Sequence, residues 1–293
     1  MWARIKNIAL AFDLEAYKIT NSKLKSNALF KKMNLPAPES WPDCGFPIVL
    51  KPDHESGSQG VEVFNDSKTF NARFSNEQSY NNMVIQQYLK GTSISIEVAG
   101  HPGKYHAFYV IDLAMDNIHD CKRVTAPTQI SSDQINQFKK MAIAIAGKIN
   151  LTGIMDVEVI LNNSELKLIE IDARFPSQTP MAVYWSTGIN MVEILCSLFL
   201  NKSIVAFEQK YERFVIVEHV SVSRKGLKVC GEHIMAQQGP LTLQSDFYGA
   251  SEAITSFAPK KKSWVATLIF AGNSEEEVNA RKENCHQRMQ IPS

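Results

Sequence analysis

The sequence predicts an α+β fold, in which antiparallel β-hairpins alternate with amphipathic helices. Residues 46–64 and 153–172 each contain two short apolar strands separated by small polar residues, as hairpins do. Residues 132–148 place apolar side chains on one side of a helix. From about residue 205 the chain changes to strands that bracket loop-rich sequence, which indicates a small, β-rich C-terminal domain. A length of 293 residues suits two domains or so.

The remaining elements follow from apolar periodicity and from turn residues. Helices are expected at residues 22–33, 65–75, 132–148 and 190–200, and from Ser274, which forms a capping box with Glu277. Strands are expected at residues 46–50, 61–64, 83–87, 93–99, 105–113, 121–125, 153–161, 166–172, 214–222 and 264–271. The strand at residues 93–99 alternates strictly, so it is expected to be half-buried. Residues 1–12 are expected to form a strand rather than a signal peptide, because Asp13 follows at once.

Charge and cysteine usage exclude several classes of protein. The 31 basic and 30 acidic residues leave a net charge of +1, so no broad field favours nucleic acid or a membrane surface. The apolar runs are too short and too interrupted to span a bilayer. The five cysteines are odd in number, scattered and without a C-x-x-C pair, which argues against a disulfide framework and a zinc ribbon. We therefore expect a cytoplasmic protein with no nucleic-acid and no membrane partner.

A cluster of carboxylates is expected on the hairpin at residues 153–172. Alternation along its second strand places charged side chains on one face and apolar side chains on the face toward a core: Glu170, Asp172 and Arg174 against Ile169, Ile171 and Ala173. On the first strand, Asp156 and Glu158 share a face. If the hairpin pairs about Ser164, Asp156 lies across from Asp172 and Glu158 lies across from Glu170.

Four carboxylates on one face need an explanation, because like charges directly opposite one another destabilise a sheet. A solvent-facing hairpin with its polar residues outward is one interpretation, since alternation alone would produce it. A bound cation is the other, and it is favoured by the four acids and the lack of lysine in the inner register. Mg²⁺ prefers carboxylate oxygens and keeps positions open for phosphate. Arg174, one step further on, would then steady transferring phosphoryl oxygens as the catalytic residue.

A phosphate site is expected upstream. Lys51 ends an apolar strand, so its ammonium can reach nucleotide phosphates as a point charge. The loop after it offers backbone N–H groups and glycines that allow close approach, at Ser56, Gly57 and Ser58. The loop is not a Walker A motif, and a plain turn is the alternative. Lys23, beside a helix start, is a second cation candidate or a surface lysine.

The connector after the strand at residues 83–87 is a candidate for the nucleotide base. Gln86, Gln87 and Leu89 lie where backbone groups at a strand end can contact an adenine edge. An ordinary connector is the alternative, and the residues themselves leave both open.

Taken in order, these motifs resemble those of the ATP-grasp family: a first lysine, a strand lysine with a glycine-rich loop, a connector and a closing E…E-x-[ND]-x-R motif. The resemblance covers about residues 20 to 200 and implies a fold in which two α+β subdomains clamp ATP. It implies that Lys23 and Lys51 contact the ATP phosphates. It also implies that Mg²⁺, or Mn²⁺, is held by the acids, with Arg174 at the transferred phosphate. Those acids are Glu158, Glu170 and Asp172, with Asp156 as an additional ligand.

Longer segments are similar to one branch of this family, the amino-acid ligases of pyrrolysine biosynthesis. These segments are EIDARFPSQTP, AVYWSTGIN, GEHI, FYGASEAIT and KKSWVATLI. The similarity implies two small-molecule substrates, 3-methyl-D-ornithine and L-lysine, joined through an acyl phosphate. Ser177, Gln178 and Thr179 directly follow Arg174 and are candidates to line the amino-acid pocket, or to form the turn that starts a helix before Pro180.

The resemblance also predicts the domain organisation. Residues 1–20 are expected to be the remnant of an N-terminal Rossmann-like domain that is otherwise largely missing, with its last strand and loop near residues 8–17. Residues 21–203 form the ATP-grasp domain and residues 204–293 the C-terminal domain. A homodimer or a separately encoded N-terminal domain would then complete the substrate pocket. Three functions remain open: this ligase, an Mg–ATP-binding fragment without turnover, and a ligase for another amino acid.

Overall fold

The computed structural model describes residues 10–55, 57–74, 80–200 and 208–290. The chain forms two compact units that are discontinuous in sequence: Met1–Phe108, Ile130–Pro176 and Val192–Val205 make the first, and Tyr109–Gln129, Ser177–Met191 and Ala206–Ser293 make the second. The domain boundaries expected after residues 20 and 203 therefore stay predictions. Most of the strand expected at residues 1–12 lies outside the described residues.

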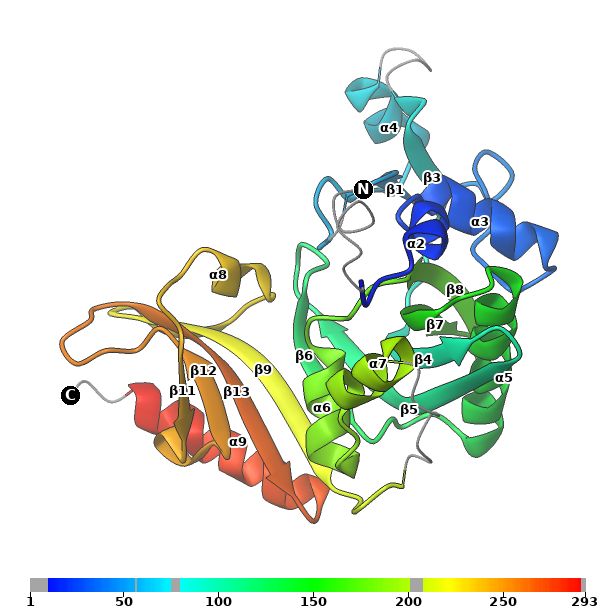
Figure 1. Ribbon diagram of the computed structural model, residues 1–293. Coiled ribbons are helices and arrows are strands. Elements are labelled where there is room, and N and C mark those ends of the chain that lie inside the picture. The colour runs from blue at the N-terminus through cyan, green and yellow to red at the C-terminus, as the bar shows by residue number, and fades with distance from the viewer. Residues whose placement is uncertain (1–9, 56, 75–79, 201–207, 291–293) are drawn as a thin grey trace. The chain divides into compact units, whose positions relative to one another are not determined.

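The first unit contains a three-stranded antiparallel sheet in the order β2-β1-β3 (Figure 1). Its strands are Ile48–Pro52 (β1), Glu62–Phe64 (β2) and Met83–Gln87 (β3), so the expected hairpin at residues 46–64 is confirmed. Helix α4 (Ser67–Arg73) and the neighbouring loops supply an aromatic core that packs on this sheet. Phe70 lies at its centre, with the rings of Trp41 and Phe64 each 5.3 Å from its own.

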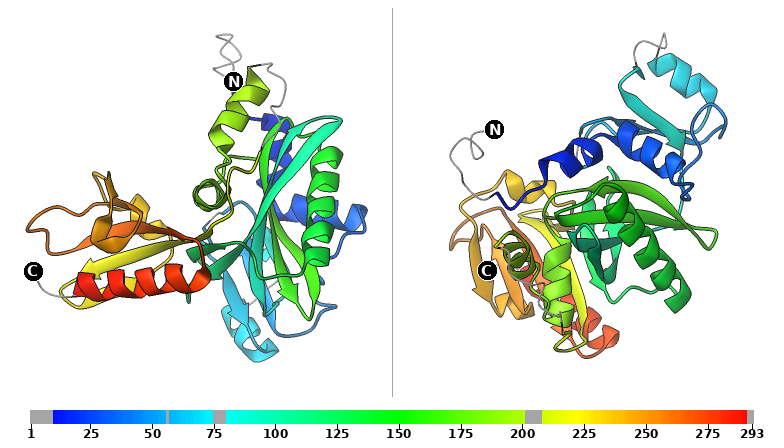
Figure 2. Two further views of the ribbon diagram at one scale, coloured as in Figure 1. Left: turned by 90° about the horizontal axis from the view of Figure 1, so that it is seen from below. Right: turned by 45° about the vertical axis from the view of Figure 1, so that its right-hand side comes forward.

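The same unit contains a second sheet region, in the order β5-β4-β7-β8. These strands are Thr92–His101 (β4), Lys104–Met115 (β5, which continues into the second unit), Gly153–Asn162 (β7) and Glu165–Asp172 (β8). Helix α5 (Ser132–Lys148) begins at a capping box made by Ser131 and Gln134, and it runs along one face of these strands (Figure 2). The expectation that β4 is half-buried is wrong, because its residues from Ser93 to Gly100 are buried on both faces.

Residues 14–20 are helical, which corrects the loop expected there, while the strand expected to begin near residue 8 lies mostly outside the described residues. Asp13 is the N-cap of helix α2 (Leu14–Thr20), and its Oδ1 accepts the N–H groups of Glu15 and Ala16 at 3.1 and 3.0 Å. Its Oδ2 also accepts the Thr152 N–H at 2.8 Å. A carboxylate with this capping role favours a helix over an extended continuation of the chain. Helix α3 (Lys23–Lys32) follows, with Ser22 as its N-cap.

The hairpin β7–β8 turns through Asn163 and Ser164, whose φ angles are 48° and 68°. Two positive φ values in a two-residue loop are typical of a type I′ turn. Ladder pairing begins at Asn162 opposite Glu165, and a β-bulge interrupts it between Glu158 and Val159. The bulge adds one residue to β8, so Ile169 leaves the core face where it was expected, while Ile171 is 1% exposed.

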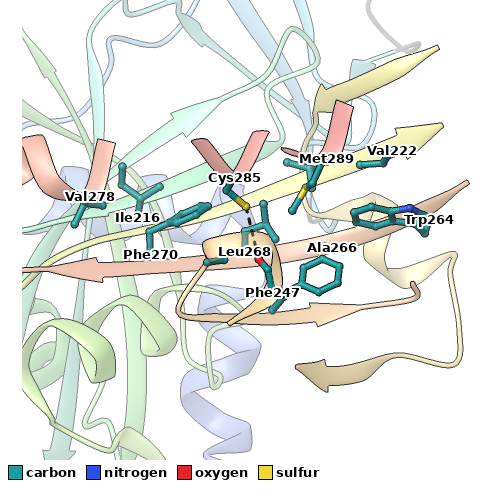
Figure 3. Close-up of a cluster of buried hydrophobic side chains, with 13 residues drawn as sticks. Ile216, Val222, Phe247, Trp264, Ala266, Leu268, Phe270, Val278, Cys285 and Met289 are labelled. Atoms are coloured by element: carbon teal, nitrogen blue, oxygen red, sulfur yellow. Dashed lines mark hydrogen bonds between the residues drawn. The ribbon is translucent and has the colours of Figure 1, made fainter. Parts of the chain in front are cut away.

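The second unit is an antiparallel sheet in the order β11-β12-β13-β9-β6-β5, with β10 paired to β9. Its strands are Cys121–Ala126 (β6), Phe214–Ser223 (β9), Gly226–Val229 (β10), Thr242–Ser245 (β11), Glu252–Thr255 (β12) and Trp264–Gly272 (β13). Helix α9 (Glu275–Gln290) covers one face and closes the core with Val278, Cys285 and Met289 (Figure 3). Ser274 accepts the Glu277 N–H at 3.2 Å, as expected, but the Glu277 carboxylate accepts from Asn273 rather than from Ser274.

The remaining elements are short helices: Thr179–Thr187 (α6), Met191–Phe199 (α7), His233–Ala236 (α8) and a 3₁₀ turn, Phe247–Gly249 (η2). Sequence periodicity missed α6, α8 and η2, as it missed α2. Among the described residues, no single helix is long and apolar enough to cross a membrane, although the bent pair α6 and α7 passes that test together by length and composition alone. All five cysteines are free, as the sequence predicts.

Candidate active site

Two rows of polar side chains cross strands β4, β7 and β8 on one face. Asp156 lies opposite Asp172 on one side and Glu97 on the other. In the next row, Glu158 lies opposite Glu170 and Ser95. The cross-strand pairs expected from the sequence are therefore present.

The bulge is what makes this register possible. A turn that pairs Asn162 with Glu165 would, without an extra residue, place Glu158 opposite Ile169. The bulge at Ile169 moves Glu170 into that position instead. The acids consequently share a face even though the turn is centred half a residue before Ser164.

Basic side chains already neutralise part of the acid cluster, so a cation is not the only group that offsets the repulsion. The Lys23 Nζ lies 3.1 Å from Glu170 Oε1, and it also donates to the Glu55 carbonyl at 2.6 Å. The Arg174 Nε lies 2.6 Å from Asp172 Oδ2. Each basic residue thus holds one carboxylate of β8.

The two carboxylates of β7 are in a different electrostatic state. The pKa of Asp156 is raised to about 7, chiefly by burial and also by Asp172 and Glu170, while the hydrogen bond from Ser95 and the charge of Arg174 oppose the rise. Burial and the neighbouring acids also raise the pKa of Glu158 well above its usual value. These carboxyls therefore tend to keep a proton unless a cation replaces it.

The residues fit a hard divalent cation. The donors are carboxylate oxygens, which Mg²⁺ prefers. Asp172 Oδ1 is buried and makes no hydrogen bond, so a ligand position is open beside the Arg174 ion pair. In the described part of the chain, no three His, Cys, Asp or Glu side chains already converge closely enough to hold a metal. The acid side chains must therefore move closer together before the set can coordinate a shared ion.

The two candidate phosphate lysines belong to this cluster. Burial lowers the pKa of Lys51, against the attraction of Glu170 and with a contribution from the like charge of Lys23. Lys51 lies on β1 and Lys23 in the first turn of α3. Two segments that are far apart in sequence therefore direct ammonium groups toward the acids.

Asp53 holds the lysine-bearing helix against the loop that follows β1. Its carboxylate accepts the Ser22 hydroxyl at 2.8 Å and the Leu24 N–H at 2.9 Å, and its carbonyl accepts the Lys23 N–H at 3.1 Å. The carboxylate thus caps α3 from outside the helix, which fixes the first turn that carries Lys23.

The glycine-rich loop has the backbone that close approach to a phosphate requires. Gly57, Ser58 and Gly60 have φ angles of 60°, 58° and 70°. A Cβ at Gly57 would meet nothing within 4 Å, so the space beside this loop is open. Ser56, expected to contribute, lies outside the described residues.

Several polar groups of the connector already make hydrogen bonds within the protein. Gln86 is buried and its Oε1 accepts from Asn27 at 2.9 Å, so its side chain has a structural role. The N–H groups of Gln87 and Tyr88 donate to Glu39 and Pro47. A base contact at this connector is therefore restricted to its other backbone groups, next to the buried side chain of Leu89.

The three substrate candidates lie at the start of α6. Ser177 donates to Glu232 at 2.8 Å. Gln178 is buried and contacts His219 at 2.8 Å. Thr179 is also buried. All three belong to the second unit, whereas the acid cluster belongs to the first.

Sequence reasoning missed three residues. Asp53 and Ser95 act through contacts made across the fold, and no sequence pattern signals them. Glu97 was detectable, because it is an acid within an apolar strand and is 0% exposed in the structure.

Comparison with known proteins agrees with this geometry. The ATP-grasp domain family matches residues 20–178. The chain belongs to the ATP-grasp family, within its ATP-dependent carboxylate–amine ligases. It is 35% identical over 275 residues to the 3-methyl-D-ornithine–L-lysine ligase of Methanosarcina mazei, covering 92% of this chain and 69% of that protein. It is 24% identical over 226 residues to the carbamoyl-phosphate synthase of Methanobrevibacter smithii, covering 71% and 60%.

Solved structures share the fold. Biotin carboxylase of Campylobacter jejuni, in complex with an ATP analogue, aligns with a TM-score of 0.74 at 14% identity over 99% of this chain and 75% of that one. An L-amino acid ligase of Bacillus licheniformis aligns with a TM-score of 0.67 at 18% identity over 98% and 75%. A biotin carboxylase domain of Hydrogenobacter thermophilus that holds MgADP aligns with a TM-score of 0.70 at 14% identity over 92% and 66%. ATP and Mg²⁺ are thus general to the family.

Proposed function

We propose that the chain joins the carboxylate of 3-methyl-D-ornithine to the ε-amine of L-lysine, at the expense of ATP, in pyrrolysine biosynthesis. The alignment with the Methanosarcina ligases, which extends over 92% of this chain, is the observation that carries the proposal. The alignment is much longer than the ATP-grasp domain match at residues 20–178, so it also includes most of the chain after residue 178.

A carboxylate is a poor acylating agent, so the reaction needs two steps. The γ-phosphoryl group passes to a carboxylate oxygen of methylornithine, which gives an acyl phosphate and ADP. The ε-amine of lysine then attacks the acyl carbon, the C–N bond forms, and the bond to the phosphate oxygen breaks. The ε-ammonium loses its protons to solvent or base on the way, and the products are the isopeptide and inorganic phosphate.

The side chains of the first unit would position and neutralise these groups. Lys23 and Lys51 would hold the phosphates together with the backbone of the loop at Ser56, Gly57 and Ser58. Arg174 would donate to the transferred phosphoryl oxygens, from its present place beside Asp172. The nucleotide base would lie at the connector, residues 86–89.

The carboxylates Glu158, Glu170 and Asp172 would hold Mg²⁺, with Asp156 as a fourth candidate. Bound there, Mg²⁺ neutralises phosphate charge during transfer. Mn²⁺, which suits the same oxygen ligands, should substitute for it. The raised pKa of Glu158 and the open Asp172 Oδ1 support this assignment. Ser177, Gln178 and Thr179 would line the amino-acid pocket.

The decisive test is ADP release with Mg–ATP and both amino acids, with the isopeptide identified by mass spectrometry. Omission of either amino acid should stop ADP release. Folded protein that is thermally stabilised by Mg–ATP but releases no ADP would instead be a nucleotide-binding fragment. If a mass-spectrometric screen found product from a different amino acid, the ligase activity would stand and the assigned substrate would be wrong. Light scattering of the same sample would show whether two copies of the chain associate.

A further inference from the structure

A charged triad is buried between the sheet of the second unit and helix α9. Glu218 of β9 is 0% exposed, and it lies opposite Arg123 of β6 in the ladder. The Arg123 Nε and Nη2 lie 2.6 and 2.5 Å from Glu218 Oε1, and the Nε2 of His286 on α9 lies 2.7 Å from Glu218 Oε2. Apolar side chains of the same layer, such as Ile216 and Val278, surround these charges (Figure 3).

Stability alone does not account for this triad. A buried ion pair is often no more stabilising than apolar side chains of the same volume, because both charges lose their hydration. Burial acts to raise the pKa of Glu218, but the contact with His286 and the charge of Arg123 outweigh it, so the pKa lies below its usual value. The carboxylate is therefore charged, and its two contacts with the guanidinium hold Arg123 in one orientation.

The oriented guanidinium forms part of the wall of a cavity of about 120 Å³. Strands β6 and β9 and the first turns of α9 enclose it, and all of its lining belongs to the second unit. Its apolar surface comes from Phe214, Ile216 and Val278. A cavity of about 150 Å³ can hold benzene, so this one suits a ligand of about five or six non-hydrogen atoms.

The cavity has hydrogen-bond donors that suit a carboxylate. Arg123 uses Nε and Nη2 on Glu218, but its Nη1 makes no hydrogen bond with a described residue. The Asn279 Oδ1 accepts from Lys282 Nζ at 3.0 Å, and an ammonium group can only donate, so the amide NH₂ of Asn279 is left as a donor. The hydroxyl of Thr125 is a third donor in the lining.

The lining also includes an acid, Glu275, in the first turn of α9. A carboxylate would repel a simple anion across so small a cavity. It would attract an ammonium group, so the combination of Arg123 and Glu275 favours a ligand that carries both charges.

We propose that this cavity binds a small α-amino acid as a zwitterion. Arg123 and Asn279 would hold its carboxylate, Glu275 its ammonium group, and Phe214 would contact its aliphatic side chain. L-Lysine is larger than the cavity, so this site is distinct from the pocket for the substrate. The inference does not depend on the proposed function, because none of these residues is assigned to the ligase reaction.

The test uses three probes of similar size: L-alanine, propionate, which lacks the ammonium group, and ethylamine, which lacks the carboxylate. Each is titrated into the intact, ¹⁵N-labelled chain and followed by NMR. The wild type should bind L-alanine about 10-fold more tightly than either other probe, because two charged contacts replace one. The shifted amide signals should come from residues 123–126, 214–216 and 275–279.

Two variants separate the two ends of the ligand. Glu275 is exposed, so Glu275→Gln should keep the fold, which its melting temperature checks. The affinity of this variant for L-alanine should fall to about that for propionate, because the ammonium group loses its partner. Thr125→Val should instead weaken L-alanine and propionate alike. Glu276→Gln, which changes the next residue of α9 outside the cavity lining, is the matched control and should bind L-alanine as the wild type does.

Equal binding of the three probes by the wild type would overturn the proposal, as would unchanged L-alanine binding in Glu275→Gln. Amide shifts confined to residues 177–182 would place L-alanine in the candidate substrate pocket and would also overturn it.

Discussion

Glu170 is the residue whose substitution tests the metal assignment most directly. Its carboxylate lies 3.1 Å from the Lys23 ammonium and opposite Glu158, so it can serve either as an ion-pair partner or as a metal ligand. These two roles respond differently to loss of the negative charge. A partly buried ion pair contributes to stability, whereas a metal ligand supports the reaction directly.

Glu170→Gln should therefore reduce Mg²⁺-dependent ADP release by roughly 10²- to 10³-fold, because a metal ion contributes several kcal/mol to transition-state stabilisation. Its melting temperature should stay close to that of the wild type. Glu165→Gln is the matched control, since Glu165 lies on the same strand and pairs with Lys167 at 2.8 Å. Wild-type ADP release in Glu170→Gln would reject the metal role.

Asp156 should give the protein without metal a distinct dependence on pH. Its folded-state pKa of about 7 is above the unfolded value, so the folded state binds the proton more tightly. This contribution to stability is fully present below about pH 4 and is lost as the pH rises through 7. Asp156→Asn should remove this loss, so its free energy of unfolding at pH 8 should exceed that of the wild type by about 1–2 kcal/mol. The gain is smaller than full burial would give, because the side chain is only half-buried.

Urea denaturation of wild type and Asp156→Asn at pH 4 to 8 measures this difference and cancels the titration of other groups. Parallel stability profiles for the two proteins would show that Asp156 titrates normally. Added Mg–ATP should stabilise the wild type more at pH 8 than at pH 6, because a cation competes with the proton.

At the scale of elements, the β7–β8 turn combines a favourable and an unfavourable residue. Asn163 tolerates its φ of 48°, but Ser164 at 68° bears the strain that glycine avoids. Ser164→Gly should stabilise the protein by about 0.5–1 kcal/mol, the relief of left-handed strain less the entropy cost of glycine. Chemical denaturation measures the gain, and ADP release should not change. A loss of stability would mean that Ser164 contributes more than its backbone conformation.

The strands around the site show what sequence can and cannot predict. Alternation predicts the acid face of β7 and β8 because the strand period is two. The bulge at Ile169 could not be predicted, since it depends on how the turn and the acid pairs fit together. Burial of both faces of β4 could not be predicted either, because Ser93, Ser95 and Glu97 resemble a solvent face in sequence. Helix α2 was missed because Asp13 acts as a cap only within the folded chain.

At the scale of the whole molecule, the candidate groups are divided between the two compact units. The phosphate lysines, the acids and Arg174 belong to the first, and Ser177, Gln178 and Thr179 belong to the second. The chain passes from the first unit to the second after Pro176, shortly after the acid hairpin ends. Residues 109–129 belong to the second unit because strand β6 pairs with β9, which lies about 90 residues further along the chain. Sequence periodicity cannot predict such long-range pairing, so it could not predict these two units.

Ligands should therefore protect different amides from hydrogen exchange. Mg–ATP should slow exchange at residues 53–60 and 156–174, because binding to the native state adds to local stability. L-Lysine added afterwards should slow exchange at residues 177–182. Mass spectrometry of peptic fragments resolves these regions, and the fragments of α9 provide an internal control. Protection of residues 177–182 by Mg–ATP alone would contradict the assignment of nucleotide binding to the first unit and amino-acid binding to residues 177–179.

The Asp53 carboxylate that caps α3 has a consequence for the evolution of the family. It accepts the Ser22 hydroxyl through both oxygens, at 2.8 and 3.0 Å, and so joins two chain positions that are 31 residues apart. A relative that replaces the hydroxyl at position 22 with an apolar group would leave this acid short of a donor. Positions 22 and 53 should accordingly covary among homologues, with a hydroxyl accompanying an acid and both being exchanged together.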